Sequence, residues 1–165
     1  MKYAAPTWLP GGHLQTIYPA LFIRKPPVTY RRERWHTPDG DFIDVDFVDG
    51  TPGQPFVVLF HGLEGSSDSH YARSLMARIQ AMGWSGAIPH FRGCSGELNH
   101  APRFYHSGDA EEVDWIIRRL AAQPGRRDAK FYAVGVSLGG NALLRWLGES
   151  QHEADFIDAA CAISA

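Results

Sequence analysis

One pentapeptide in the sequence combines residue types and spacing that could do chemistry. Gly135, Ser137 and Gly139 form a Gly-x-Ser-x-Gly motif between an apolar run, 131–134, and an amphipathic run that follows it. A strand that turns sharply into a helix would expose the Ser137 hydroxyl at the edge of a sheet. Side chains at the two glycine positions would collide with backbone in such a turn, and glycine avoids the collision. The motif predicts a nucleophilic serine; the alternative is a glycine-rich turn without chemistry.

A serine nucleophile for acyl transfer also needs a base and two hydrogen-bond donors for the oxyanion. We expect the backbone N–H of Leu138 to be one donor, because this residue opens the helix after the turn. The second donor should come from the loop after an earlier strand, and the sequence His61-Gly62-Leu63-Glu64-Gly65 follows an apolar run there. We assign this donor to Leu63 and expect the two glycines, Gly62 and Gly65, to let the loop turn around the oxyanion. The alternative is that His-Gly simply ends a strand.

The elements that must position these residues predict an α/β fold with a largely parallel sheet. Segments 28–36 and 42–48 flank a Thr-Pro-Asp-Gly turn and should form an antiparallel hairpin with one face in water. Apolar and amphipathic runs then alternate. The predicted strands lie at 56–60, 84–89, 131–134 and 158–165, and the predicted helices at 69–82, from 107 or 109 to about 122, and from 138 onward.

Three candidate residues fall at the ends of predicted strands: His61, His90 and Ser137. The carboxyl ends of parallel strands share one edge of a sheet, and ligands bind at that edge. We therefore expect these residues to converge. Cys161 lies in the last apolar strand and is expected in the core. Asp109 is expected to cap a helix or, as the less favoured alternative, to contact the long loop 90–105.

Composition and charge narrow the class of protein. The 165 residues suit one domain, with residues 1–27, which hold five prolines, as an irregular arm lying over residues 28–165. A net charge of -2 gives no reason to expect nucleic acid, and no apolar run is long enough for a membrane span. Two cysteines and no signal peptide favour a cytoplasmic location. The eight histidines show no helical metal-binding pair, so no metal site is predicted.

Four separated motifs make the chain resemble the α/β-hydrolase superfamily, and within it the YheT/EMB8-like branch of esterase-type hydrolases. The motifs are Gly11–Thr16, His61–Ser66, Phe91–Gly96 and Gly135–Gly140. The resemblance implies a serine hydrolase that acts on small carboxylic esters, with short or lipid-like acyl groups, through an acyl-enzyme at Ser137. It also implies an oxyanion hole from Leu63 and Leu138, a loop-shaping role for His61, and no cofactor.

The sequence departs from the superfamily after Ser137, where the order should be acid, then histidine. The residues available there are Glu149, His152, Glu153, Asp155 and Asp158. At 1.5 Å per residue, the helix after Ser137 would carry His152 about 20 Å away, toward the opposite edge of the sheet. We therefore expect residues 28–165 to be the N-terminal half of a hydrolase domain, without the acid and histidine.

That gap keeps a second function open, in which the chain is a catalytically inactive truncated hydrolase or a partner-binding domain. A nucleotide-binding turn is less favoured, because residues 135–140 fit neither the dinucleotide nor the P-loop pattern. The last predicted strand would leave an open apolar edge, and such an edge invites self-association.

Overall fold

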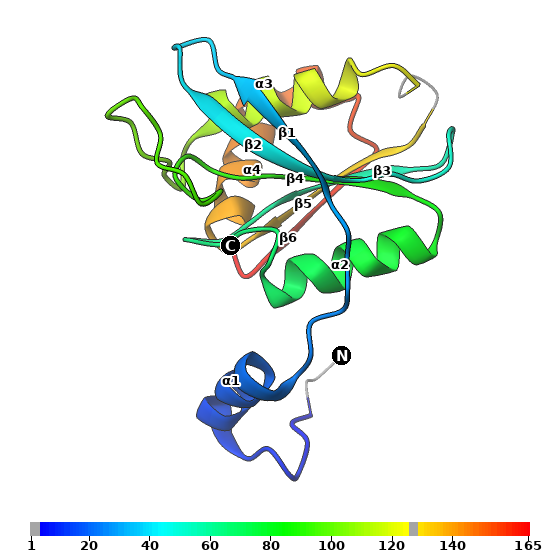
Figure 1. The fold of residues 1–165 in the computed structure, drawn as a ribbon, viewed down its shortest axis with the longest axis vertical. Coiled ribbons are helices and arrows are strands. Elements are labelled where there is room, and N and C mark those ends of the chain that lie inside the picture. The colour runs from blue at the N-terminus through cyan, green and yellow to red at the C-terminus, as the bar shows by residue number, and fades with distance from the viewer. Residues whose placement is uncertain (1–3, 126–128) are drawn as a thin grey trace.

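The computed structural model describes residues 4–125 and 129–165. Their strands form one mixed sheet in the order β1-β2-β4-β3-β5-β6, with helices on both faces (Figure 1). The hairpin strands are antiparallel to each other and β2 is antiparallel to β4, whereas β4, β3, β5 and β6 run parallel. The bounds are β1 Arg31–His36, β2 Phe42–Val48, β3 Phe56–Phe60, β4 Ser85–Pro89, β5 Phe131–Val136 and β6 Ala159–Ile163. The predicted α/β class, with its N-terminal hairpin, is confirmed.

Two layers of helix cover the sheet. Helix α2, His70–Ala81, lies on one face, and α3, Ala110–Ala121, and α4, Leu138–Ser150, lie on the other. A short 3₁₀ helix, Gln151–Ala154, follows α4.

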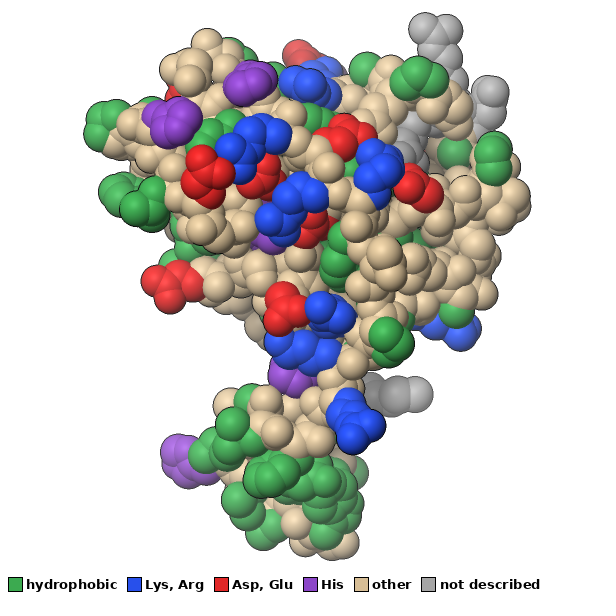
Figure 2. Space-filling model, viewed as in Figure 1, with side chains coloured by type: hydrophobic (Ala, Val, Ile, Leu, Met, Phe, Trp, Pro, Cys, Tyr) green, Lys and Arg blue, Asp and Glu red, His purple; other side chains and the backbone are tan. Residues whose placement is uncertain are grey.

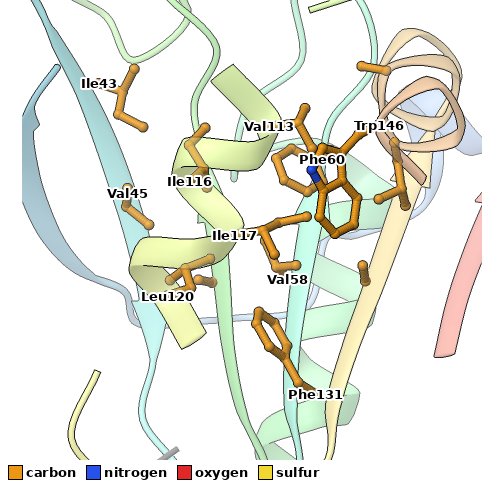
Figure 3. Packing of buried hydrophobic residues seen from close by; sticks show 14 of the residues in the cluster. Ile43, Val45, Val58, Phe60, Val113, Ile116, Ile117, Leu120, Phe131 and Trp146 are labelled. Carbon is orange, nitrogen blue, oxygen red and sulfur yellow. The ribbon is translucent and has the colours of Figure 1, made fainter. Parts of the chain in front are cut away.

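The core between the sheet and its α3–α4 layer is made of large apolar side chains. Ile117 of α3 and Trp146 of α4 point toward Val58 and Phe60 of β3, and all four are buried (Figure 3). Burying a side chain of this size contributes roughly 1.5–3 kcal/mol. This packing fixes α4, and with it the turn that precedes α4, against the central strands.

The hairpin differs from the prediction, because β2 has no wet face: all of its residues are buried, Asp44 and Asp46 included. Arg34 and Arg32 of β1 each reach across the pair and hold one of these carboxylates with two hydrogen bonds of 2.7–2.9 Å. Paired guanidinium groups replace water, so a buried carboxylate is tolerated. Figure 2 shows Lys or Arg and Asp or Glu side chains side by side on the face where the hairpin lies.

The N-terminal arm also needs correction, because residues 11–22 are not irregular but form α1, Gly11–Phe22. Four of the five prolines lie outside α1, and only Pro19 lies within it. Proline before or after a helix bounds it without breaking it. The arm does not lie over the domain either: α1 stands away from the sheet with no buried residue, and apolar side chains gather on it (Figures 1 and 2). No helix in the described ranges is long and apolar enough to cross a membrane.

The last strand, β6, lies at an edge of the sheet and pairs with β5 alone. All five of its residues are exposed, which is the open apolar edge that the sequence predicts. The expectation that Cys161 belongs to the core is therefore wrong for this chain. The strand is apolar enough for a core, but no described strand pairs with its outer side.

Candidate active site

The structure brings the three predicted residues to one edge of the sheet. His61, His90 and Ser137 directly follow the parallel strands β3, β4 and β5. The His61 and His90 rings are 6.0 Å apart between centroids. A Cβ built on Gly62 would lie 3.4 Å from the Cβ of Ser137. The loop after β3 and the turn after β5 are therefore in contact.

Ser137 occupies a strained turn between β5 and α4. Its φ is 52° and its ψ is -118°, a backbone conformation that residues with a Cβ rarely adopt. A Cβ at Gly139 would lie 2.4 Å from the carbonyl oxygens of Phe60 and His61, and one at Gly135 would lie 2.6 Å from the Gly139 oxygen. Both glycines are thus required by close backbone contact, as predicted.

The turn presents the Ser137 side chain to solvent. The Ser137 N–H donates to the Ile163 oxygen at 2.8 Å, which anchors the turn to the end of β6. The residue is exposed, and its hydroxyl makes no hydrogen bond within the described ranges. Strain that the surrounding structure holds in place is a frequent property of functional residues.

Two backbone N–H groups lie on the elements that flank Ser137 without a hydrogen-bond acceptor among the described residues. Leu138 is the first residue of α4, where helical N–H groups have no partner in their own helix. Leu63 is the middle residue of three, and the N–H groups on either side of it are occupied. Gly62 donates to the Tyr71 hydroxyl at 2.9 Å, and Glu64 donates to the Tyr105 hydroxyl at 2.8 Å.

The His61 ring forms hydrogen bonds to backbone groups of two loops. Its Nδ1 lies 2.7 Å from the Gly62 oxygen, and its Nε2 accepts a hydrogen bond from the Phe91 N–H at 3.0 Å. Burial lowers the pKa of His61 to about 4, against the raising effect of the bond to Gly62. The ring is therefore neutral, with its proton on Nδ1, and both nitrogens are occupied.

His90 is anchored in a comparable way. It is buried, with Nε2 2.8 Å from a carboxylate oxygen of Asp46 and Nδ1 3.2 Å from the Cys94 oxygen. Burial by itself would raise the pKa of Asp46, but hydrogen bonds from Arg32, His90 and Ser67 hold it well below its usual range. His90 therefore joins the loop after β4 to the buried carboxylate of β2.

Three of the four acidic residues after Ser137 form ion pairs away from it. Asp158 accepts from Lys130 at 2.5 Å and from the Phe131 N–H at 2.7 Å, which places it at the start of β5, the edge opposite Ser137. Glu149 pairs with Arg145 and Glu153 with Arg118. His152 is exposed on the 3₁₀ helix that precedes β6.

A buried ion cluster, which the sequence did not predict, holds the loop 91–108. Arg92 is only 4% exposed and pairs with Asp39, Asp41 and Glu112 at 2.9–3.1 Å. Burial raises the pKa of Glu112 to about 7, although Arg92 acts in the opposite direction. Asp109 stands at the N-cap position of α3 but makes no cap hydrogen bond; it accepts from Arg103 at 2.8 Å, which is the alternative contact with the long loop. In the described ranges, no group of three or more His, Cys, Asp or Glu residues could hold a metal ion.

Tyr71 and Tyr105 are the residues at this site that sequence reasoning missed. Tyr71 lies on a predicted helix, where an aromatic residue suggests packing. Tyr105 is 41 residues from the N–H that it accepts. Neither position carries a local signal, and the only available clue is that both fall on segments that flank the predicted edge.

Comparison with known proteins gives relatives that include proteins named as an esterase and a phospholipase. YheT of Escherichia coli strain K12, which is named an esterase, is 45% identical over 157 residues, 93% of this chain and 45% of its own length. The embryogenesis-associated protein EMB8 of Picea glauca is 29% identical over 83% of this chain and 32% of its own length. Phospholipase ABHD3 of Homo sapiens is 31% identical over 89% of this chain and 37% of its own length. No family model matches the chain.

Among solved structures, the α/β hydrolase GrgF from a Penicillium species has the same fold. It superposes with a TM-score of 0.65 at 15% identity, over 82% of this chain and 45% of GrgF. The chain spans less than half the length of these relatives.

Proposed function

We propose that this chain, a member of the α/β-hydrolase superfamily in the branch of YheT and EMB8, supplies the nucleophile and the oxyanion hole of a serine hydrolase that cleaves carboxylic esters. One observation carries the proposal: an exposed serine on a strained turn, next to a loop and a helix start that each offer an unoccupied N–H. Such donors stabilise the negative charge that develops on a carbonyl oxygen under attack.

The proposed reaction forms an acyl-enzyme at Ser137. The Ser137 Oγ attacks the ester carbonyl while a base removes its proton, and the N–H groups of Leu63 and Leu138 bind the resulting oxyanion. The carbonyl re-forms, the C–O bond to the alcohol breaks, and the alcohol leaves with that proton. Water then attacks the acyl-enzyme in the same way, which releases the carboxylic acid and restores the serine. Loss of one oxyanion donor typically costs about 10²–10³ in kcat.

Neither anchored histidine suits the role of the base. His61 has its Nε2 occupied by the Phe91 N–H, and His90 has both ring nitrogens within hydrogen-bond distance of Asp46 and Cys94. We therefore propose that the acid and the histidine come from residues outside the described ranges. The relatives extend well beyond the matched region, which is where such residues would lie.

For the substrate we propose small esters with short or lipid-like acyl groups. The names of the relatives, one an esterase and one a phospholipase, favour this class. A cytoplasmic location stays a prediction of the sequence.

An inactive or partner-binding domain is the second candidate. The engagement of Asp158, Glu149 and Glu153 in ion pairs away from Ser137 favours it for the chain by itself. A serine hydroxyl without a base is a weak nucleophile.

Labelling with a fluorophosphonate probe separates the two candidates. The chain, the complete product of its gene, and the Ser137→Ala variant of that product are compared. Ser164→Ala is the matched control, because Ser164 is also an exposed serine at a φ of 52°. Labelling of the gene product that Ser137→Ala abolishes and Ser164→Ala preserves supports the hydrolase. A folded gene product that stays unlabelled refutes it and supports the second candidate.

A further inference from the structure

Two tyrosine hydroxyls surround the loop His61–Gly65. The first belongs to Tyr71 in α2, whose oxygen accepts from the Gly62 N–H at 2.9 Å. This oxygen also fills the space beside Gly65, where a Cβ would lie 2.7 Å from it. Gly65 in turn donates its N–H to the Gly62 oxygen at 2.9 Å, so the loop closes around the Tyr71 hydroxyl.

The second hydroxyl belongs to Tyr105, at the end of the long loop after β4. It accepts from the Glu64 N–H at 2.8 Å and also contacts the Cys94 thiol. Its ring stacks on Phe91, with centroids 5.1 Å apart and an angle of 7° between the planes. Because Phe91 also donates to His61, the loop after β4 supports the loop after β3 at two points.

Among the described residues, the two tyrosine hydroxyls leave the Leu63 N–H free between two occupied N–H groups. Of the three consecutive N–H groups of Gly62, Leu63 and Glu64, the outer two are held by the tyrosines, and that of Leu63 has no acceptor within the described ranges. Glu64 has a φ of 50°, a conformation that needs support from its surroundings. The Gly62 oxygen, which shares a peptide unit with the Leu63 N–H, is held by the Gly65 N–H and by His61 Nδ1. The two adjoining peptide units are held by the tyrosine hydroxyls, and we expect the loss of either hydroxyl to shift the Leu63 N–H.

We propose that Tyr71 and Tyr105 form a clamp: they are positioning residues that select the Leu63 N–H as the oxyanion donor, by occupying its two neighbours and fixing the peptide plane between them. This inference rests on the proposed function. Catalysis is sensitive to such placement, since a shift of about 1 Å can cost about 10²-fold in rate.

The test uses Tyr105→Phe and Tyr71→Phe in the complete gene product, assayed with p-nitrophenyl butyrate. Phenylalanine keeps the ring and removes only the hydrogen-bond acceptor. Tyr30→Phe is the matched control, because Tyr30 is also half-buried and its hydroxyl donates to the Ser67 oxygen at 3.0 Å, just outside the loop. We expect kcat to fall about 10–100-fold in each clamp variant with KM changed less than about twofold, and no such loss in the control.

Hydrogen exchange of the backbone gives a readout that does not depend on activity. In Tyr105→Phe the Glu64 N–H should exchange faster, in Tyr71→Phe the Gly62 N–H should, and both should keep their wild-type rates in the control. Folded variants with unchanged kcat overturn the proposal, and so does an equal loss in Tyr30→Phe. If the wild-type product hydrolyses no ester, the proposed function fails by itself, and unchanged exchange at Gly62 and Glu64 would show that the clamp fails as well.

Discussion

From the backbone strain at Ser137 we predict that glycine at this position gives a more stable protein than alanine, the reverse of their usual order. A residue with a Cβ at a φ of 52° and a ψ of -118° costs about 1–3 kcal/mol. Glycine relieves that strain but adds about 0.5–1 kcal/mol of backbone entropy to the unfolded state. Ser137→Gly should therefore be more stable than Ser137→Ala by about 1 kcal/mol, although neither variant retains the hydroxyl.

Thermal and urea denaturation of the two variants measure this difference. For a protein of this size, 1 kcal/mol corresponds to a shift of about 2–4 °C in Tm. The comparison is clean because the Ser137 side chain is exposed and makes no hydrogen bond that either variant would lose. An alanine variant as stable as the glycine variant, or more stable, would refute the view that the turn stores strain to expose its serine.

Three further predictions follow from the packing, the charges and the sheet edge. Gly139→Ala should lower the free energy of unfolding, measured by urea titration, by several kcal/mol, because the added Cβ would meet two backbone oxygens at 2.4 Å. Gly148→Ala should raise it by up to about 1 kcal/mol, because nothing lies within 4 Å of the added Cβ. Because the folded state raises the pKa of Glu112 to about 7, the free energy of unfolding should fall by up to about 3 kcal/mol as the pH rises from about 5 to 8. The Glu112→Gln variant should flatten that part of a profile of Tm against pH. An unchanged slope in this variant would contradict the assignment of the pH dependence to Glu112. Cys161→Lys, with Cys161→Ser as its control, should reduce self-association in sedimentation velocity, because a charge on the open edge of β6 opposes pairing with another strand.

The parts of the fold that the sequence predicts are those whose cause is local. The continuous apolar run of β3 predicts a strand buried on both faces, and the structure buries all five residues. The ends of β3, β4 and β5 then place His61, His90 and Ser137 on one edge, because parallel strands share their direction. Even the need for Gly139 follows from the tightness of a strand–turn–helix connection.

The parts that it does not predict depend on partners far along the chain. Asp46 looks like a solvent-facing residue until Arg32, His90 and Ser67 are placed around it from three other segments. The helix α1 escapes prediction for a different reason: five prolines in 27 residues suggest irregular structure, yet four of them lie outside the helix and one of these, Pro10, is its N-cap. A count of prolines says less than their positions.

The two groups of residues that the proposed acyl transfer needs, oxyanion donors and a base, depend on different structural features of this chain. The Leu63 N–H lies between two N–H groups that donate to tyrosine hydroxyls, one on α2 and one on the loop 91–108, whereas the Leu138 N–H is left free within its own helix by the start of α4. The same anchoring occupies Nε2 of His61 and both ring nitrogens of His90, so neither histidine is free to act as the base of the proposed reaction. If the proposed function holds, the base must come from another segment. The Ser137 N–H donates to the Ile163 oxygen at the end of β6, so the serine turn and β6 are joined at this point.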